Sequence, residues 1–184
     1  MKKTAVIFPG IGYHTDKPLL YYSSKLAASK GYEIIKISYP PCDVNLKEAD
    51  SSQIGSFVKE CLAAVNTALK EKDLINNDEI LFISKSIGTA IAAAYALSID
   101  HPVRHIFFTP LEETFAYVFK GCGIAFNGTD DSWADCETVA GLCKGMDIPL
   151  TTIDGANHSL ETGDVLADTE TIGKIMAAVS KVIV

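Results

Sequence analysis

The chain has 184 residues, of which 48% are hydrophobic and 21% are charged, and its formal net charge is -7. This length provides one sizeable core but is short for two, so we expect residues 1–184 to form a single domain. The negative charge, with no cluster of lysine and arginine, argues against a nucleic-acid partner. The composition also excludes a disordered or fibrous chain.

Short apolar stretches argue against export and membrane insertion. The run from Ala5 to Phe8 ends at Pro9 and is shorter than the apolar region of a secretory signal. Residues 87–97 are the most apolar stretch, and they are too few to cross a bilayer. We therefore expect a cytoplasmic protein with no membrane partner. The five cysteines lack metal-ligand spacing, so we expect reduced thiols and no metal.

Six short runs rich in β-branched and aromatic residues predict buried strands. They span residues 4–8, 33–38, 80–83, 105–108, 124–126 and 150–153. Residues 54–69 and 172–183 each place apolar side chains at helical spacing along one face. Gly31 is expected to end the first helix, and Asp168 or Thr169 to cap the last.

Strands that alternate with helices predict an α/β fold. We expect a three-layer α/β/α sandwich, with a mostly parallel sheet of about six strands covered by helices on both faces. Small residues dominate positions 88–96, so the helix there is expected to lie close against the central strands. Ligands bind beyond the carboxyl ends of the strands in such a sheet, and functional residues are therefore expected just after each strand.

Ser86 stands where the third predicted strand meets a helix, within residues 84–89, SKSIGT. A tight turn at this place exposes a serine hydroxyl and directs the first amide of the helix toward its target. The nucleophile-elbow pattern G-x-S-x-G is incomplete, because Ser84 replaces the first glycine. The alternative interpretation is an ordinary junction in which Ser86 caps the helix.

A serine nucleophile needs a base, and the base needs an acceptor that fixes its tautomer. His158 follows the sixth predicted strand and is the expected base, with His14 as a competitor. Asp131 follows the fifth strand and is the expected acceptor. Its alternatives are Asp130 and the carboxylates at 112 and 113.

The order serine, acid, histidine resembles that of the α/β-hydrolase family. Residues 84–89 resemble its elbow, residues 128–131 fit its G-x-x-D, and residues 155–159 resemble its histidine loop. The resemblance implies a small lidless serine hydrolase of minimal fold, lacking the family's first two antiparallel strands. Residues 9–12, PGIG, stand where family members carry H-G-x-G. The implied oxyanion donors are the amides of Ile11 and Ile87, with Gly12 as the alternative to Ile11.

Residues 109–123 leave room for only one short helix between the fourth and fifth strands, so we expect an open site. Tyr13, Tyr39 and Trp133 are the expected substrate-binding side chains. Further candidates for the pocket wall are Leu111, Phe115 and Leu160. Lys85 is expected to be a solvated charge or part of a local ion pair, because adjacent residues in a turn point apart.

These residues predict a serine hydrolase that cleaves an ester or thioester of a small molecule through an acyl-enzyme, with an amide as a further option. We expect no cofactor, and a monomer or homodimer. The alternative is a non-catalytic binding protein on the same scaffold, which the serine at position 84 motivates. A nucleotide-binding domain fits poorly, since Thr15 stands at the third glycine of G-x-G-x-x-G.

Overall fold

The computed structural model describes residues 1–41 and 49–183. Its strands form one parallel sheet in the order β2-β1-β3-β4-β5-β6. The strands are β1 Lys3–Phe8, β2 Tyr32–Lys36, β3 Glu79–Lys85, β4 Val103–Phe108, β5 Gly123–Gly128 and β6 Leu150–Ile153. The helices are α1 Pro18–Ser29, α2 Ser51–Leu69, α3 Ile87–Ala96, α4 Cys136–Gly145 and α5 Val165–Val182, with the short 3-10 helix η1 at Glu112–Ala116.

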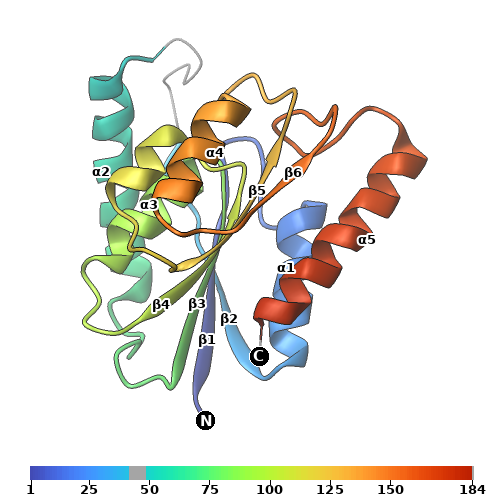
Figure 1. Ribbon diagram of the computed structural model, residues 1–184. Coiled ribbons are helices and arrows are strands. Elements are labelled where there is room, and N and C mark those ends of the chain that lie inside the picture. The colour runs from blue at the N-terminus through green and yellow to red at the C-terminus, as the bar shows by residue number, and fades with distance from the viewer. Residues whose placement is uncertain (42–48, 184) are drawn as a thin grey trace.

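Helices cover both faces of the sheet, as Figure 1 shows: α2, α3 and α4 lie on one side, and α1 and α5 on the other. Each side has its own hydrophobic core. In β1, Val6 and Phe8 face the core beneath α2 and α3, whereas Ala5 and Ile7 face the core beneath α1 and α5. This alternation of buried side chains follows from the period of two in a strand. The predicted three-layer fold and its six strands are confirmed.

The start of the last helix was predicted wrongly. The helix is capped by Asp164, whose side chain accepts hydrogen bonds from the amides of Leu166 and Ala167. Asp168 instead accepts hydrogen bonds from the amides of Thr162 and Gly163, which fixes the segment that precedes the helix. Gly31 follows α1 with a φ of 86°, as expected of a residue that ends a helix.

The cysteines and the apolar helices were also the subject of predictions. The cysteines at positions 122, 136 and 143 are free, Cys61 is buried, and Cys42 lies outside the described residues. Within residues 1–41 and 49–183, no helix combines the length and the apolar character that a membrane span requires.

Candidate active site

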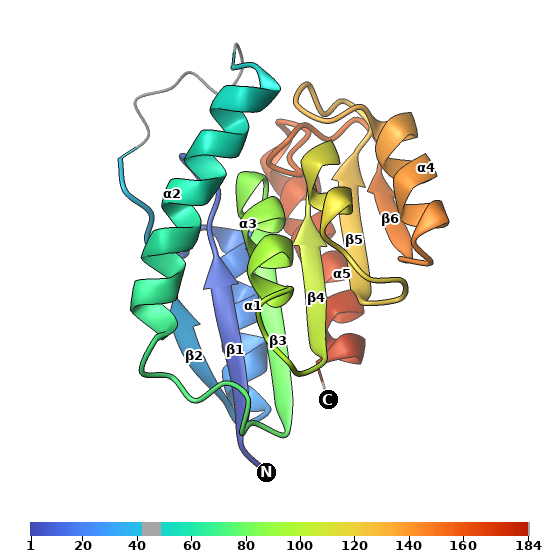
Figure 2. The same cartoon turned by 90° about the vertical axis from the view of Figure 1, so that its left-hand side faces the viewer.

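The segments that follow β3, β5 and β6 meet at one edge of the sheet, because all six strands run in the same direction. Figure 2 shows the arrowheads of the strands pointing toward this edge. Ser86 follows β3, Asp131 follows β5, and His158 follows β6. The loop after β6 leans back over β5, where the Ala156 carbonyl accepts from the amide of Asp130 at 3.0 Å. This brings His158 toward Ser86.

Ser86 has an unusual backbone conformation, with a φ of 56° and a ψ of -131°. Few residues other than glycine adopt a positive φ, and those that do are concentrated at functional sites. The residue stands at the N-terminal cap of α3, but its side chain makes no capping hydrogen bond. Ser86 is therefore the N-cap of α3 by position, as the alternative interpretation expects, but its hydroxyl does not cap the helix.

The turn tolerates Ser84 but requires Gly88. Ser84 is buried in β3, and its hydroxyl donates to the Ile106 carbonyl at 3.3 Å. A β-carbon at Gly88 would come within 2.2 Å of the Pro9 carbonyl oxygen. The close approach to β1 thus needs glycine at the second position of the elbow, whereas the first position has room for a serine.

Ser86, His158 and Asp131 form a continuous chain of hydrogen bonds. The Nε2 atom of His158 lies 2.8 Å from Oγ of Ser86. Its Nδ1 atom lies 2.9 and 2.8 Å from the two carboxylate oxygens of Asp131. In the tautomer with a proton on Nδ1, the imidazole donates to the carboxylate and accepts from the serine hydroxyl. This arrangement allows the serine to lose its proton as it attacks an acyl carbon.

The Asp131 carboxylate is held in its charged form. Burial raises the pKa of this carboxyl, but the hydrogen bond and charge of His158 and the amides of Trp133 and Ala134 lower it. The balance leaves the Asp131 pKa below its ordinary value. Those two amides donate to Oδ1 at 2.8 and 3.3 Å. The neighbouring Asp130 side chain, the alternative acid, is exposed.

The loop that carries His158 is fixed from both ends. Asn157 accepts hydrogen bonds from the amides of Ser159 and Glu161 through its side-chain oxygen, which closes a tight turn around His158. Leu160 has a φ of 61° and is buried against the core beneath α1 and α5. On the β5 side, a β-carbon at Gly128 would come within 2.0 Å of the Ala156 carbonyl oxygen.

A pocket of about 200 Å³ opens beside the serine. Its walls include Ser86, His158, Tyr13 and Trp133, so two of the three predicted substrate-binding side chains line it. The Trp133 ring stacks on the His158 imidazole with 5.4 Å between centroids and 26° between planes. Trp133 remains 39% exposed, at the mouth of the site.

The two predicted oxyanion donors flank Ser86. Gly10 donates to the Tyr13 carbonyl and closes a tight turn with Ile11 and Gly12 at its centre. This turn abuts the serine, because a β-carbon at Gly10 would lie 3.1 Å from the β-carbon of Ser86. Ile87 is the first residue of α3, where an amide has no partner within the helix.

The structure places Tyr39 outside this pocket. Tyr39 packs against the core beneath α2 and lines a neighbouring hollow formed with residues 9–12. The reason is topological, since β2 lies at the edge of the sheet and β1 separates it from β3. The exposed His14 borders the same hollow, not the Ser86 pocket. The other candidates for the pocket wall, Leu111, Phe115 and Leu160, pack in the hydrophobic cores and do not line the pocket.

The expectation for Lys85 is wrong. The side chain is only 1% exposed, and its amine donates to the Thr109 hydroxyl at 2.5 Å. Lys85 lines the same pocket as Ser86. Burial, the largest effect, lowers the pKa of the Lys85 ammonium from its ordinary value to about 7. No short-range pattern indicates this burial, because Tyr13 and Thr109, which enclose the amine, follow other strands.

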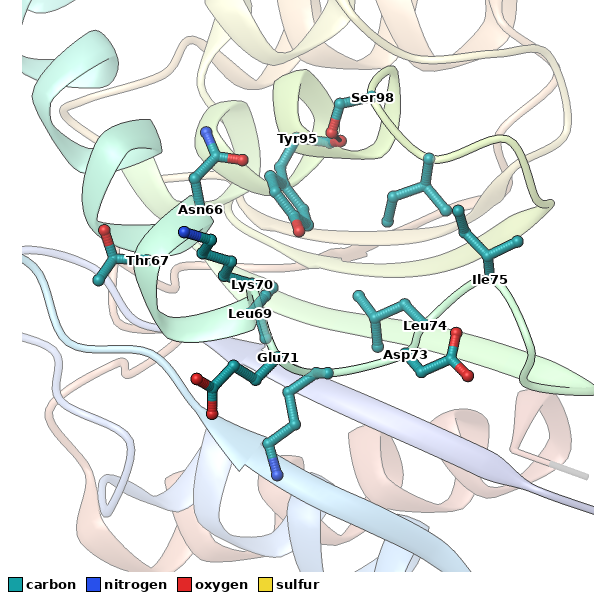
Figure 3. A pocket seen from close by; sticks show the side chains of 12 residues that line it. Asn66, Thr67, Leu69, Lys70, Glu71, Asp73, Leu74, Ile75, Tyr95 and Ser98 are labelled. Atoms are coloured by element: carbon teal, nitrogen blue, oxygen red, sulfur yellow. Dashed lines mark hydrogen bonds between the residues drawn. The ribbon is translucent and has the colours of Figure 1, made fainter.

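Another, larger hollow of about 600 Å³ lies away from these residues (Figure 3). It is formed by the end of α2, the segment after it and the C-terminal end of α3, where Tyr95 and Ser98 face it. Ser86 is at the opposite end of α3. In the part of the chain that the structure describes, no three His, Cys, Asp or Glu side chains are grouped so that they could hold a metal ion.

Comparison with solved structures identifies the architecture. A serine hydrolase homologue from Coxiella burnetii superposes with a TM-score of 0.67 at 13% identity, covering 100% of this chain and 85% of that one. The chain has the α/β-hydrolase fold. A serine hydrolase without a lid from Xanthomonas campestris gives a TM-score of 0.64 at 10% identity, with 97% and 79% of the two chains covered.

A third similar structure is Est1E from Butyrivibrio proteoclasticus with ferulic acid bound. It gives a TM-score of 0.62 at 13% identity and covers 96% of this chain and 88% of that one. No protein-family model matches the sequence, and no curated protein matches it. The absence of a lid between β4 and β5, where only η1 intervenes, agrees with the lidless α/β-hydrolase fold.

Proposed function

We propose that this protein is a serine hydrolase that cleaves an ester or thioester of a small molecule through an acyl-enzyme. The observation that carries the proposal is the hydrogen-bonded chain Ser86–His158–Asp131 with the serine at a positive φ. A binding protein that used the scaffold without chemistry would not need a serine in a strained turn joined to a histidine and a buried carboxylate.

In the acylation step, Oγ of Ser86 attacks the carbonyl carbon of the substrate while Nε2 of His158 takes the hydroxyl proton. The amides of Ile11 and Ile87 donate to the oxyanion, and each such donor contributes on the order of a hundredfold to a thousandfold in turnover. His158 then donates its proton to the leaving group. Asp131 keeps the imidazole oriented and stabilises its cationic form.

In the deacylation step, a water molecule takes the place of the leaving group. His158 removes a proton from this water as it attacks the acyl-serine, and returns the proton to Oγ of Ser86 as the acid is released. The structural neighbour Est1E binds ferulic acid, a carboxylic acid of the kind that ester hydrolysis releases. The open pocket beneath Trp133 suits a small acyl group and its leaving group.

Labelling with a fluorophosphonate tests the nucleophile. We expect one phosphonyl group per chain by intact mass, on Ser86 by peptide mapping, and no labelling of Ser86→Ala. The matched control is Ser159→Ala, because Ser159 also lines the pocket. This control should still be labelled.

Hydrolysis of para-nitrophenyl acetate and of an acetyl thioester then measures turnover. Labelling of Ser86→Ala, or a label on Ser159, would assign the nucleophile elsewhere. A wild-type protein that is neither labelled nor active on either ester would favour the non-catalytic alternative.

A further inference from the structure

Lys85 precedes the proposed nucleophile, and its amine is buried in the wall of the same pocket. The amine donates to the Thr109 hydroxyl and lies 5.1 Å from the centroid of the Tyr13 ring. An ammonium group has three N–H donors. The hydroxyl takes one of them, and no carboxylate among the described residues lies within ion-pair distance of Lys85. The pocket therefore contains a buried amine whose hydrogen-bonding capacity is only partly used.

A second lysine lies on the same ring. The amine of Lys17, at the start of α1, lies 5.2 Å from the centroid of the Tyr13 ring, and Lys17 lines the Ser86 pocket. Two amines thus contact one aromatic ring beside the serine. The Tyr13 hydroxyl is itself occupied, because it accepts from the Leu19 amide at 3.2 Å. The ring is fixed in place between α1 and the pocket.

The residue that holds Lys85 is strained. Thr109 has a φ of 43°, which is costly for a β-branched residue. Its amide donates to the Phe126 carbonyl at 2.7 Å, which ties the strained residue to the neighbouring strand β5. A buried lysine is expensive unless its charge is compensated, and strain of this kind is concentrated at functional sites. The Tyr13 ring and the carboxylates of Asp131 and Glu161 compensate the charge only in part, and a substrate anion would add to this compensation.

We infer that Lys85 and Lys17 form an anion subsite beside Ser86, so that the preferred substrate is a small ester or thioester carrying a carboxylate. This inference rests on the proposed hydrolase function and names its substrate class. Lys85 does not act as the general base here, since Nε2 of His158 already contacts the Ser86 hydroxyl. Its amine instead binds the charged end of the substrate while the serine attacks the acyl carbon.

The charges around Lys85 predict how the subsite depends on pH. The pKa of Lys85 is lowered to about 7, with burial as the largest cause and the charge of Lys17 adding to it, while the carboxylates of Asp131 and Glu161 oppose the shift. Asp131 is engaged by His158. Above pH 7 the free enzyme progressively loses the Lys85 charge, so the preference for an anionic substrate should weaken.

Matched pairs of esters test the subsite. One pair carries the charge on the acyl group: para-nitrophenyl hydrogen glutarate against the same ester with its distal carboxylate converted to an amide. The other pair carries it on the leaving group: para-acetoxybenzoate against para-acetoxybenzamide. Rates with Ser86→Ala protein are subtracted. At about pH 6, we expect kcat/KM for the anionic member of at least one pair to exceed that of its neutral partner by about tenfold or more.

Three substitutions locate the preference. Lys85→Met should abolish most of this ratio, and Lys17→Met should reduce it. The matched control is Lys25→Met, which also removes a lysine over a tyrosine ring, that of Tyr21, but lies outside the pocket. The ratio in this control should equal that of the wild type. A ratio near one in both wild-type pairs, or a ratio that Lys85→Met leaves unchanged, overturns the inference.

The pH profile gives a test that needs no substitution in the subsite. Both members of a pair depend on His158 in the same way, so its titration cancels from the ratio of their kcat/KM values. The ratio should fall as the pH rises from about 6 to about 9, and a constant ratio would overturn the inference. Fluorophosphonate labelling and turnover of the neutral esters report the hydrolase itself. Their failure refutes the proposed function, whereas success with a ratio of one refutes only the subsite.

Discussion

Gly88 lies so close to Pro9 that a β-carbon at this position would come within 2.2 Å of the Pro9 carbonyl oxygen. The contact joins the first turn of α3 to the end of β1. It therefore sets the position of Ser86 relative to residues 10–12, which carry one proposed oxyanion donor. A change at Gly88 should affect both stability and the geometry of the site.

We expect Gly88→Ala to lower the free energy of unfolding by about 1–3 kcal/mol, because the methyl group must displace backbone atoms. Urea unfolding measures the loss. Gly173→Ala is the matched control, since Gly173 lies in the exposed part of α5 and a β-carbon there meets nothing within 4 Å. This control should gain roughly 0.5–1 kcal/mol. Equal stability of the two variants would show that the contact with Pro9 relaxes freely.

Asp131→Asn should preserve the shape of the site but remove the carboxylate that orients His158. On the proposed mechanism, kcat for ester hydrolysis should fall on the order of a thousandfold to ten-thousandfold. The adjacent Asp130→Asn is the matched control, because the Asp130 side chain is exposed. A similar loss of kcat in both variants would mean that the substitutions disturb the fold of the loop. Far-ultraviolet circular dichroism and urea unfolding would detect such a disturbance.

Trp133→Ala removes the ring that stacks on His158. Stacking of aromatic groups contributes about 0.5–1.5 kcal/mol, so kcat/KM should fall by a factor of about 2 to 13. Phe119→Ala serves as the control, since Phe119 is 63% exposed and lines no part of the Ser86 pocket. If Trp133→Ala retains full activity, the indole is only a lining of the pocket and does not position the imidazole.

His105 should make the protein sensitive to acid. Burial lowers the pKa of its imidazole to about 3, and its Nδ1 atom has no hydrogen-bond partner among the described residues. The unfolded chain binds a proton at His105 below about pH 6.5, whereas the folded chain does not, so stability is full above that pH and declines below it.

The expected loss from His105 is about 1.4 kcal/mol for each pH unit between the unfolded and folded pKa values. His105→Phe keeps an aromatic ring beside Phe107, on which His105 stacks. Urea unfolding between about pH 7 and about pH 4 should give a shallower decline for this variant. Identical slopes would mean that other groups account for the loss of stability in acid.

The strands and the positions of Ser86, Asp131 and His158 could be found from the sequence because each depends on short-range signals. Apolar runs mark the strands, and chain order places the three polar residues after strands at one edge of a parallel sheet. Whether these residues catalyse hydrolysis stays a prediction. Helix α4, which begins at the capping residue Asp135, was not predicted.

The missed features depend on contacts between distant parts of the chain. Lys85 is buried because Tyr13 and Thr109, from the ends of β1 and β4, enclose its amine. Tyr39 lies outside the pocket because it follows β2, and β1 separates β2 from β3 in the sheet. The order of strands in the sheet cannot be read from the sequence. Asp164 and Asp168 are both suitable N-caps for α5. Only the fold of residues 160–164 determines that Asp164 caps the helix while Asp168 binds the Thr162 amide.

The stacking of Trp133 on His158 has a practical consequence, because the chain contains one tryptophan. All indole fluorescence of this protein therefore arises at the mouth of the Ser86 pocket. Its emission and quenching report the site directly, without any attached dye. The binding of a ligand in the pocket, or the formation of an acyl group on the serine, can thus be followed in real time by the fluorescence of Trp133.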